Sequence, residues 1–305
     1  MGRNWRLIKG PDVEYLLEDA GLDKSEAEEV EMGDVLDTLV AEHDGEEVIF
    51  QGAVNNHRDS SHNLLMTGGR VLDYLDTDFV PEVIEMNYND EYAWHLIEKV
   101  DGRHPVGDDW YEVGNVISEL YEIEADFDYG ALIGTEKGLQ TKLSTEKWSR
   151  FLDERFRRFK IKSIGTPLED EAFKLDYVWS SIPEENPERS LLHNDIISGN
   201  SLVSKEETVL LDFDQAIVGD PSLEFYKAIE NLKFRGIEPE SFQNGYLENR
   251  DVKTSLKDHY TAYSLMNQIY THNSRVNTGI ESGRVTTELI KERVDEFVDS
   301  LGTSP

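Results

Sequence analysis

The chain has 305 residues, with 63 Asp or Glu against 30 Lys or Arg, so its formal net charge at pH 7 is −33. A charge of this size repels nucleic acid and anionic lipid surfaces, which excludes both as partners. The chain has no Cys, which excludes disulfides and thiolate zinc sites.

A surface this acidic is typical of a protein that works in concentrated salt, where the Debye length falls to about 3 Å at 1 M. No run approaches the roughly 18 to 20 apolar residues that a membrane-spanning helix needs. Residues 1–17 lack the apolar segment of a signal peptide. We therefore expect a cytoplasmic protein from a halophilic archaeon. The sequence does not indicate its oligomeric state.

The first elements along the chain are a short helix and a hairpin. Residues 11–21 predict the helix, because proline suits its first turn and glycine its end. Asp44 and Gly45 lie between two apolar runs, 38–41 and 47–53, and this dipeptide is a strong hairpin signal. An antiparallel sheet is therefore expected in this part of the chain.

A second helix and a further strand follow the hairpin. Residues 64–75 predict the helix, although Gly68 and Gly69 lower its helix propensity. Residues 91–102 predict a strand that runs into a linker ending at Gly102, and Trp94 on this strand is expected in the core.

After Gly102 the pattern becomes mainly helical. Thr145 is a candidate N-cap, and Trp148 and Phe151 are expected in the core. A compact β segment over 191–214 interrupts helices predicted at 110–124, 145–159, 168–182, 223–234, 253–271 and 285–301. We therefore predict an α+β fold with two lobes. Residues 1–100 form a small lobe with an antiparallel sheet, and residues 101–305 form a larger, mainly helical lobe.

The β segment carries the strongest functional signal. Two short apolar strands, 201–203 and 208–211, are joined by a charged turn, and an antiparallel hairpin brings its outer ends together. Asn200 just before the first strand and Asp212 just after the second should therefore be neighbours. An amide oxygen and a carboxylate are hard ligands suited to Mg²⁺ that also holds phosphate oxygens.

Two further polar residues precede this hairpin. Asp195 lies on the loop that enters it, where a carboxylate can accept the proton of an attacking hydroxyl group. His193 lies at the end of an apolar strand and is placed to brace the loop. Phosphoryl transfer needs such parts, because its catalysis is mostly positioning and charge stabilisation.

The stretch from Leu191 to Glu224 resembles the catalytic region of the aminoglycoside phosphotransferase and choline kinase family, which has a protein-kinase-like fold. The resemblance rests on the His-x-Asp-x4-Asn spacing, the apolar hairpin, Leu211-Asp212-Phe213 and Gly219-Asp220-Pro221, all in register. It implies that Asp195 is the catalytic base, supported by His193, and that Asn200 and Asp212 bind Mg²⁺.

The resemblance extends to the nucleotide site. Residues 94–105 look like the family's strand-to-hinge segment, which implies that backbone groups near Glu98 and Val100 meet the adenine of ATP. The family's third strand normally carries a basic residue for the phosphates, and a helix carries a Glu that pairs with it. By position these two residues are Gln51 and Gly68 here. Gly33 is the one glycine of the expected phosphate-covering loop.

A missing basic residue at position 51 raises the question of what else reaches the phosphates. Arg58 and Arg70 are candidates, although Arg70 is more typical of a solvated surface residue. Gln51 and Gly68 replace both members of the family's ion pair. Loss of both is consistent, because one buried charge without its partner is costly.

The sequence therefore predicts an ATP- and Mg²⁺-dependent phosphotransferase acting on a hydroxyl of a small molecule such as an amino sugar, an amine alcohol, a sugar or a related metabolite. Asp214 and Glu224 could receive a cationic acceptor. The alternative is a catalytically inactive kinase-like protein that binds a nucleotide or metabolite. A protein kinase is disfavoured, because only residues 213–218 separate Asp212 from Gly219, which leaves no room for an activation loop.

Overall fold

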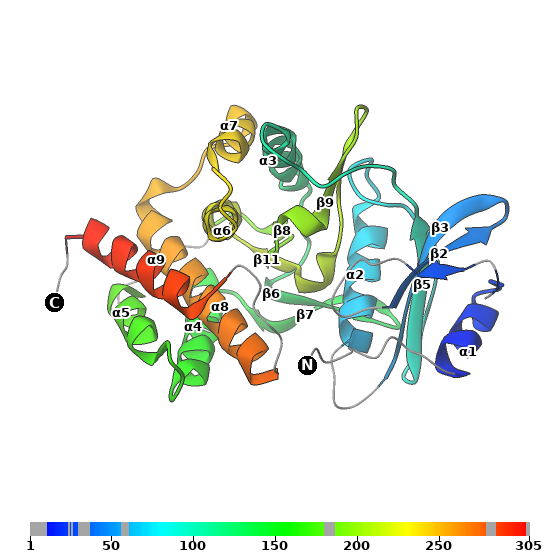
Figure 1. The fold of residues 1–305 in the computed structure, drawn as a ribbon, viewed down its shortest axis with the longest axis horizontal. Helices are drawn as coiled ribbons and strands as arrows, with labels where there is room; N and C mark the ends of the chain where they lie inside the picture. The colour runs from blue at the N-terminus through cyan, green and yellow to red at the C-terminus, as the bar shows by residue number, and fades with distance from the viewer. Residues whose placement is uncertain are drawn as a thin grey trace.

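The computed structural model describes residues 11–23, 25, 27–29, 37–55, 61–179, 187–278 and 285–302. A five-stranded sheet with two helices lies at one end of the molecule, and a mainly helical part lies at the other (Figure 1). Within these ranges, no helix combines the length and the apolar character needed to cross a membrane.

The five-stranded sheet is antiparallel throughout. Its order is β1-β2-β3-β5-β4, with strands β1 (Glu28–Glu29), β2 (Asp37–His43), β3 (Glu46–Val54), β4 (Val83–Tyr88) and β5 (Tyr92–Glu98). The predicted hairpin is confirmed: Asp44 and Gly45 join β2 to β3 with φ of 53° and 88°, as a type I′ turn requires. Strand β4 was not predicted, because it is an edge strand with mostly exposed or half-buried side chains and a register shift that interrupts its alternation.

The two faces of this sheet are covered by different helices. Helix α1 (Pro11–Asp19) buries Leu16 and Leu17 against Phe50, Trp94 and Leu96 on one face. Helix α2 (Ser61–Leu75) covers the other face, where its buried side chains Leu65 and Met66 contact Ala53, Tyr88 and Ala93. The alternation of strand side chains therefore assigns Gln51 and His95 to the α2 face.

Helix α2 also contacts the helical part of the molecule. The N–H of Gly134 donates to Thr67 Oγ1 at 3.0 Å. Arg70 donates to the carbonyl groups of Thr135 and Glu136 at 3.2 and 3.0 Å, and its guanidinium lies 5.2 Å from the centre of the Tyr88 ring. Arg70 is therefore half-buried and connects the two parts of the molecule. The prediction that it is a solvated surface residue is wrong.

The helical part contains seven helices within the described ranges: α3 (Asp109–Leu120), α4 (Trp148–Ser163), α5 (Glu169–Trp179), α6 (Pro221–Phe234), α7 (Glu240–Asn249), α8 (Lys257–Thr278) and α9 (Thr287–Ser300). The predicted helices are all present with shifted ends; α7 was not predicted. Residues 180–182 of one prediction lie outside the described residues. Trp148 and Phe151 are buried, as expected.

A second, four-stranded sheet was only partly foreseen. Its order is β7-β6-β11-β8, and its strands are β6 (Tyr129–Thr135), β7 (Gly138–Thr145), β8 (Ser190–Leu192) and β11 (Ile217–Gly219). Thr145 ends β7 and is not an N-cap. Lys147 occupies that position, and Thr145 Oγ1 instead accepts the Lys147 N–H at 3.2 Å.

Two adjacent glycines in α2 give a matched test of its packing. A β-carbon at Gly69 would collide with Tyr88 Oη and His95 Nδ1, whereas one at Gly68 would meet the Asp214 backbone nitrogen at an ordinary 3.7 Å. We expect Gly69→Ala to lower the free energy of unfolding by about 1–3 kcal/mol through overpacking. Gly68→Ala should raise it by up to about 1 kcal/mol through helix propensity. Denaturant titration measures both, and equal effects would contradict the close packing at Gly69.

Candidate active site

The predicted hairpin is confirmed, with a second strand that ends at Leu210, one residue before its predicted end. Strands β9 (Ser201–Val203) and β10 (Thr208–Leu210) pair antiparallel, with Leu210 opposite Ser201. The Leu211 N–H continues the ladder by donating to the Asn200 carbonyl at 2.9 Å. Asp212 then adopts a left-handed conformation with φ of 61°. This turn ends the strand and leaves Asn200 and Asp212 at the same end of the hairpin.

Asn200 is held by Asp195. Its Nδ2 donates to the Asp195 carbonyl at 2.9 Å and to the Asp195 carboxylate at 3.3 Å. Both contacts use the amide nitrogen, which leaves Oδ1 of Asn200 available as an oxygen ligand. The predicted base and one predicted metal ligand are therefore neighbours.

His193 braces the loop, as its position suggested. It is fully buried, and its Nε2 donates to the Leu211 carbonyl at 2.6 Å while its Nδ1 accepts the Asp195 N–H at 3.3 Å. A carbonyl can only accept and an N–H can only donate, so the proton is on Nε2. The ring also packs against Phe213 with 4.4 Å between centroids. One side chain thus joins the loop of Asp195 to the segment that carries Asp212.

Three carboxyl groups, Asp195, Asp212 and Asp214, lie close enough to influence each other. Burial, followed by the neighbouring carboxylate of Asp212, raises the pKa of Asp214 to about 8. Burial also raises the pKa of Asp212, with His193 opposing this shift and Asp195 adding to it. In the described part of the chain, none of the three carboxylates forms an ion pair with a basic side chain. The cluster is therefore not neutralised by a direct ion pair with Lys or Arg.

This donor set fits Mg²⁺. A cation would neutralise the buried carboxylates, and Asp212 and Asn200 offer two hard oxygen ligands. Among the described residues, no three Asp, Glu or His side chains form a complete metal cage. Mg²⁺ does not require one, since it usually keeps water and binds through one or two protein ligands together with phosphate oxygens.

Helix α6 supports the loop of Asp195 through three polar side chains, Glu224, Lys227 and Asn231, which we call the α6 template. The sequence did not predict this support. The buried Glu224 carboxylate accepts the N–H groups of His193, at 2.9 Å, and Asn194, as well as the Tyr121 hydroxyl at 2.6 Å. Burial raises the pKa of Glu224. This carboxylate is fully used inside the protein, so the expectation that Glu224 receives a cationic acceptor is wrong.

Lys227 and Asn231 extend the same template along α6. Lys227 Nζ contacts the carbonyl of Asn194 and donates to Asn194 Oδ1 at 2.8 Å, and burial lowers its pKa to about 8. Asn231 Nδ2 donates to the Ile196 carbonyl at 3.3 Å. Together with Glu224, these residues follow an i, i+3, i+7 spacing, which places them on one helix face. Polar residues that recur at this spacing among the apolar residues of the helix were the signal that could have found them.

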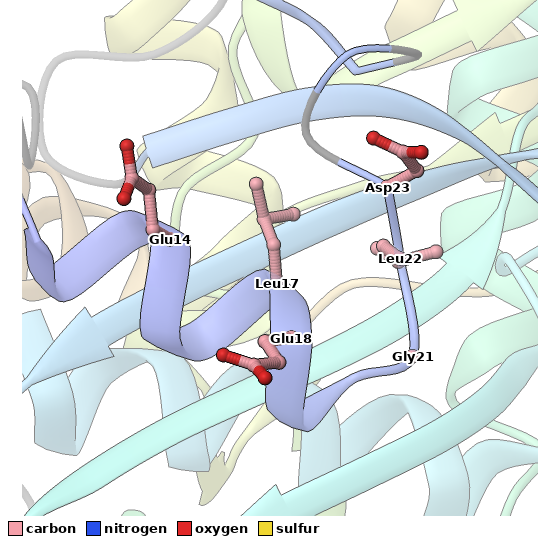
Figure 2. Close-up of a pocket in the computed structure, with 6 residues that line it drawn as sticks. All are labelled: Glu14, Leu17, Glu18, Gly21, Leu22 and Asp23. Carbon is pink, nitrogen blue, oxygen red and sulfur yellow. The ribbon is translucent and has the colours of Figure 1, made fainter.

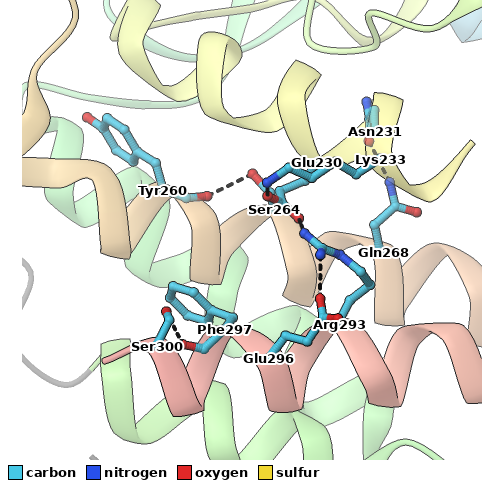
Figure 3. A network of polar contacts seen from close by, with 10 residues as sticks. All are labelled: Glu230, Asn231, Lys233, Tyr260, Ser264, Gln268, Arg293, Glu296, Phe297 and Ser300. Atoms are coloured by element: carbon cyan, nitrogen blue, oxygen red, sulfur yellow. Dashed lines mark hydrogen bonds and ion pairs between the residues drawn. The ribbon is translucent and has the colours of Figure 1, made fainter. Parts of the chain in front are cut away.

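Helices α8 and α9 also form polar contacts with α6 (Figure 3). Gln268 of α8 donates to Asn231 Oδ1 at 2.5 Å, and Arg293 of α9 donates to Glu230 at 2.8 Å and to Glu296. Of the α6 residues that touch the loop of Asp195, Asn231 is therefore itself fixed by a hydrogen bond to α8, and α9 holds the same helix through Glu230.

The residues that were predicted to contact the nucleotide are only partly described by the structure. Gly33 and Arg58 lie outside the described residues. The Glu98 side chain is exposed and its N–H donates to the Glu82 carbonyl at 2.9 Å, so any base contact there must use another backbone group. Val100 follows two residues after β5 and is half-buried. The roles of Glu98 and Val100 stay predictions.

Gln51 lies on the central strand β3, on the α2 face of the sheet. It accepts a hydrogen bond from His95 at 2.8 Å and donates to Thr38 at 3.3 Å. Gly68 faces the Asp214 backbone, so the two positions expected to carry an ion pair hold an amide and a glycine.

A hollow of about 560 Å³ lies elsewhere, on the outer side of α1 (Figure 2). Its charged lining residues are all acidic: Glu14, Glu18 and Asp23. It lies on the opposite face of the sheet from Gln51, because Leu17 packs on the α1 face. We therefore place no part of the candidate active site there.

Comparison with solved structures shows the same two-lobed, protein-kinase-like fold. The aminoglycoside phosphotransferase APH(4)-Ia matches with a TM-score of 0.69 and 15% identity, over 95% of this chain and 98% of its own. A candidate fructosamine-3-kinase from Thermobifida fusca matches with a TM-score of 0.64 and 17% identity, over 94% and 98%. The spectinomycin phosphotransferase APH(9)-Ia, solved with ADP and spectinomycin, matches with a TM-score of 0.58 and 14% identity, over 98% and 99%.

The sequence model of the family described as "Phosphotransferase enzyme family" matches residues 53–261, more than half of the chain. The chain therefore belongs to this family. The matched region contains His193, Asp195, Asn200 and Asp212 but begins two residues after Gln51. No curated protein sequence matches the chain significantly.

Proposed function

We propose that this member of the phosphotransferase enzyme family moves the γ-phosphoryl group of ATP to a hydroxyl group of a small molecule. The observation that carries the proposal is the junction at the end of the β9–β10 hairpin. There Asn200 is hydrogen-bonded to Asp195, Asp212 follows Leu211, whose N–H donates to the Asn200 carbonyl, and the loop of Asp195 is fixed to α6. Such rigid positioning is the main protein contribution to phosphoryl transfer.

Asp195 is the proposed base. As the acceptor oxygen forms its bond to the γ-phosphorus, the bond from this phosphorus to the β–γ bridging oxygen breaks and ADP leaves with that electron pair. Asp195 accepts the proton of the acceptor hydroxyl. Mg²⁺, held by Oδ1 of Asn200 and the carboxylate of Asp212, would offset the negative charge of the phosphates.

The fold favours a small acceptor. The segment after Asp212 forms a short 3₁₀ helix (Phe213–Gln215) and then enters strand β11, which pairs with both β6 and β8. It is therefore built into the sheet and offers no long loop on which a protein substrate could dock. An amino sugar, an amine alcohol, a sugar or a related metabolite remains the proposed acceptor.

The first test is calorimetric titration of the purified protein with ATP, with and without Mg²⁺, in about 1 M KCl, where surface charges are screened. We expect binding that requires Mg²⁺ and is lost in Asp212→Asn. Asparagine is preferred to alanine here because it tolerates the left-handed conformation of residue 212. Unchanged Mg²⁺-dependent binding in a folded Asp212→Asn would contradict the assigned metal site.

The amide at position 51 favours a second candidate, a kinase-like protein that binds a nucleotide or metabolite without catalysis. It predicts that ATP and ADP bind equally and that no acceptor in a broad panel of small hydroxyl compounds is phosphorylated. Phosphate transfer to any such acceptor would exclude it.

A further inference from the structure

A chain of hydrogen bonds crosses the α2 face of the five-stranded sheet. Tyr88 Oη lies 2.8 Å from His95 Nδ1, His95 Nε2 lies 2.8 Å from Gln51 Oε1, and Gln51 Nε2 lies 3.3 Å from Thr38 Oγ1. Register explains the alignment, because Gln51 pairs directly with both His95 and Thr38 across neighbouring strands. We call these four residues the polar relay.

The polar relay is uncharged, and its hydrogen bonds are all donated in one direction, from Tyr88 towards Thr38. His95 is buried, and this burial lowers its pKa to about 4, so the ring is neutral at pH 7. Gln51 Oε1 can only accept, so His95 Nε2 carries the proton and its bare Nδ1 accepts the Tyr88 hydroxyl. The Gln51 amide is thereby held with its nitrogen away from His95. Within the described ranges, one N–H of Gln51 and the O–H of Thr38 have no acceptor.

Helix α2 connects the polar relay to the acidic cluster. Gly69 leaves the space in which Tyr88 Oη and His95 Nδ1 meet, and the adjacent Gly68 faces the backbone of Asp214. Helix α2 also packs against the 3₁₀ helix that follows Asp212. One short stretch of α2 therefore separates the Tyr88–His95 end of the relay from Asp214, two residues after the proposed metal ligand Asp212.

We propose that Tyr88 and His95 are positioning residues that orient the Gln51 amide, so that Gln51 and Thr38 form an uncharged anchor for the phosphates of the bound nucleotide. The proposal rests on the proposed function. It explains how a lobe with no basic residue at position 51 can still hold a polyphosphate. Hydrogen bonds from neutral donors depend little on ionic strength, whereas the attraction of an ammonium group for phosphate is screened by salt.

The main test compares ATP and adenosine binding, both measured by calorimetry with Mg²⁺ present. We expect Tyr88→Phe, which removes the first donor of the relay, to weaken ATP binding by up to about tenfold, the upper end of the contribution of one ordinary hydrogen bond. Adenosine binding should be unchanged, because adenosine has no phosphates. His95→Leu should act in the same way, and His95→Gln, which keeps one donor and one acceptor, should recover most of the ATP affinity.

Tyr92→Phe is the matched control, because it removes a hydroxyl from the opposite face of the same region, where Tyr92 Oη accepts from Tyr15 at 3.4 Å. It should alter neither affinity. Equal weakening of ATP and adenosine in Tyr88→Phe would show a purely structural role and overturn the proposal, as would no change in either. A wild-type protein that binds no Mg²⁺–ATP would overturn the proposed function, and the anchor with it.

Gln51→Lys provides a second test that does not depend on the stability of the Tyr88 variant. Relative to wild type, it should bind ATP more tightly at about 0.1 M KCl, where the Debye length is about 10 Å, and lose this advantage at about 1 M. An ATP affinity ratio of one at both salt concentrations would mean that the phosphates do not reach position 51, which would also overturn the proposal.

Discussion

Asp195→Asn should lower the rate of phosphoryl transfer by about 10² to 10⁴, the range found for general bases. The asparagine side chain has the same shape but cannot accept the acceptor's proton. The loop should keep its conformation, because Asn200 also donates to the main-chain carbonyl of residue 195 at 2.9 Å, and this contact does not depend on the side chain. Mg²⁺–ATP binding should therefore persist.

Turnover is measured as ADP release with a responsive acceptor, and binding by calorimetry on the same samples. Asp44→Asn is the control, because it makes the same chemical change at a side chain that is 95% exposed in the β2–β3 hairpin, where asparagine also suits the turn. Wild-type turnover in Asp195→Asn would contradict the assigned base. Loss of ATP binding would show that the side chain also supports the metal site.

Glu224→Ala should lower the free energy of unfolding by about 3–5 kcal/mol, the cost of removing one partner from a buried charged network. It leaves two buried N–H groups and the Tyr121 hydroxyl without an acceptor, and Lys227 without its nearby carboxylate. Because those N–H groups belong to the loop of Asp195, turnover should also fall even where the variant remains folded.

Denaturant titration measures the first effect, and Tyr121→Phe is its control. This variant removes only one of the hydrogen bonds to Glu224 and should cost about 1 kcal/mol. If Glu224→Ala is no less stable than Tyr121→Phe, the carboxylate does not hold the loop as inferred.

The β9–β10 hairpin and its flanking polar residues could be predicted from the local sequence. Its strands are short and joined by a tight turn, so strand pairing alone brings Asn200 and Asp212 together. His193 and Asp195 lie within a few residues of the same hairpin. For this reason the candidate metal ligands, the candidate base and the histidine that braces its loop were all named from the sequence, and the structure brings these residues together.

The role of Glu224 could not be recognised in so acidic a sequence. In a chain with 63 acidic residues, no single Glu stands out, and Glu224 was assigned to the acceptor although it is buried beneath the loop. Its role depends on contact between α6 and a loop about thirty residues earlier in the chain. Only packing of these two segments reveals it.

The sequence by itself determined the two-lobed architecture, the family and the β9–β10 hairpin, because periodicity, turn residues and short-range pairing act within neighbouring residues. The tertiary structure decided the polar relay and the α6 template. Gln51, His95 and Thr38 meet only because three strands align in register, and Gly69 admits Tyr88 only because α2 lies against that sheet. Contacts of this kind depend on how whole elements pack: the spacing of polar residues along α6 marks one face of the helix, but not the loop that this face contacts.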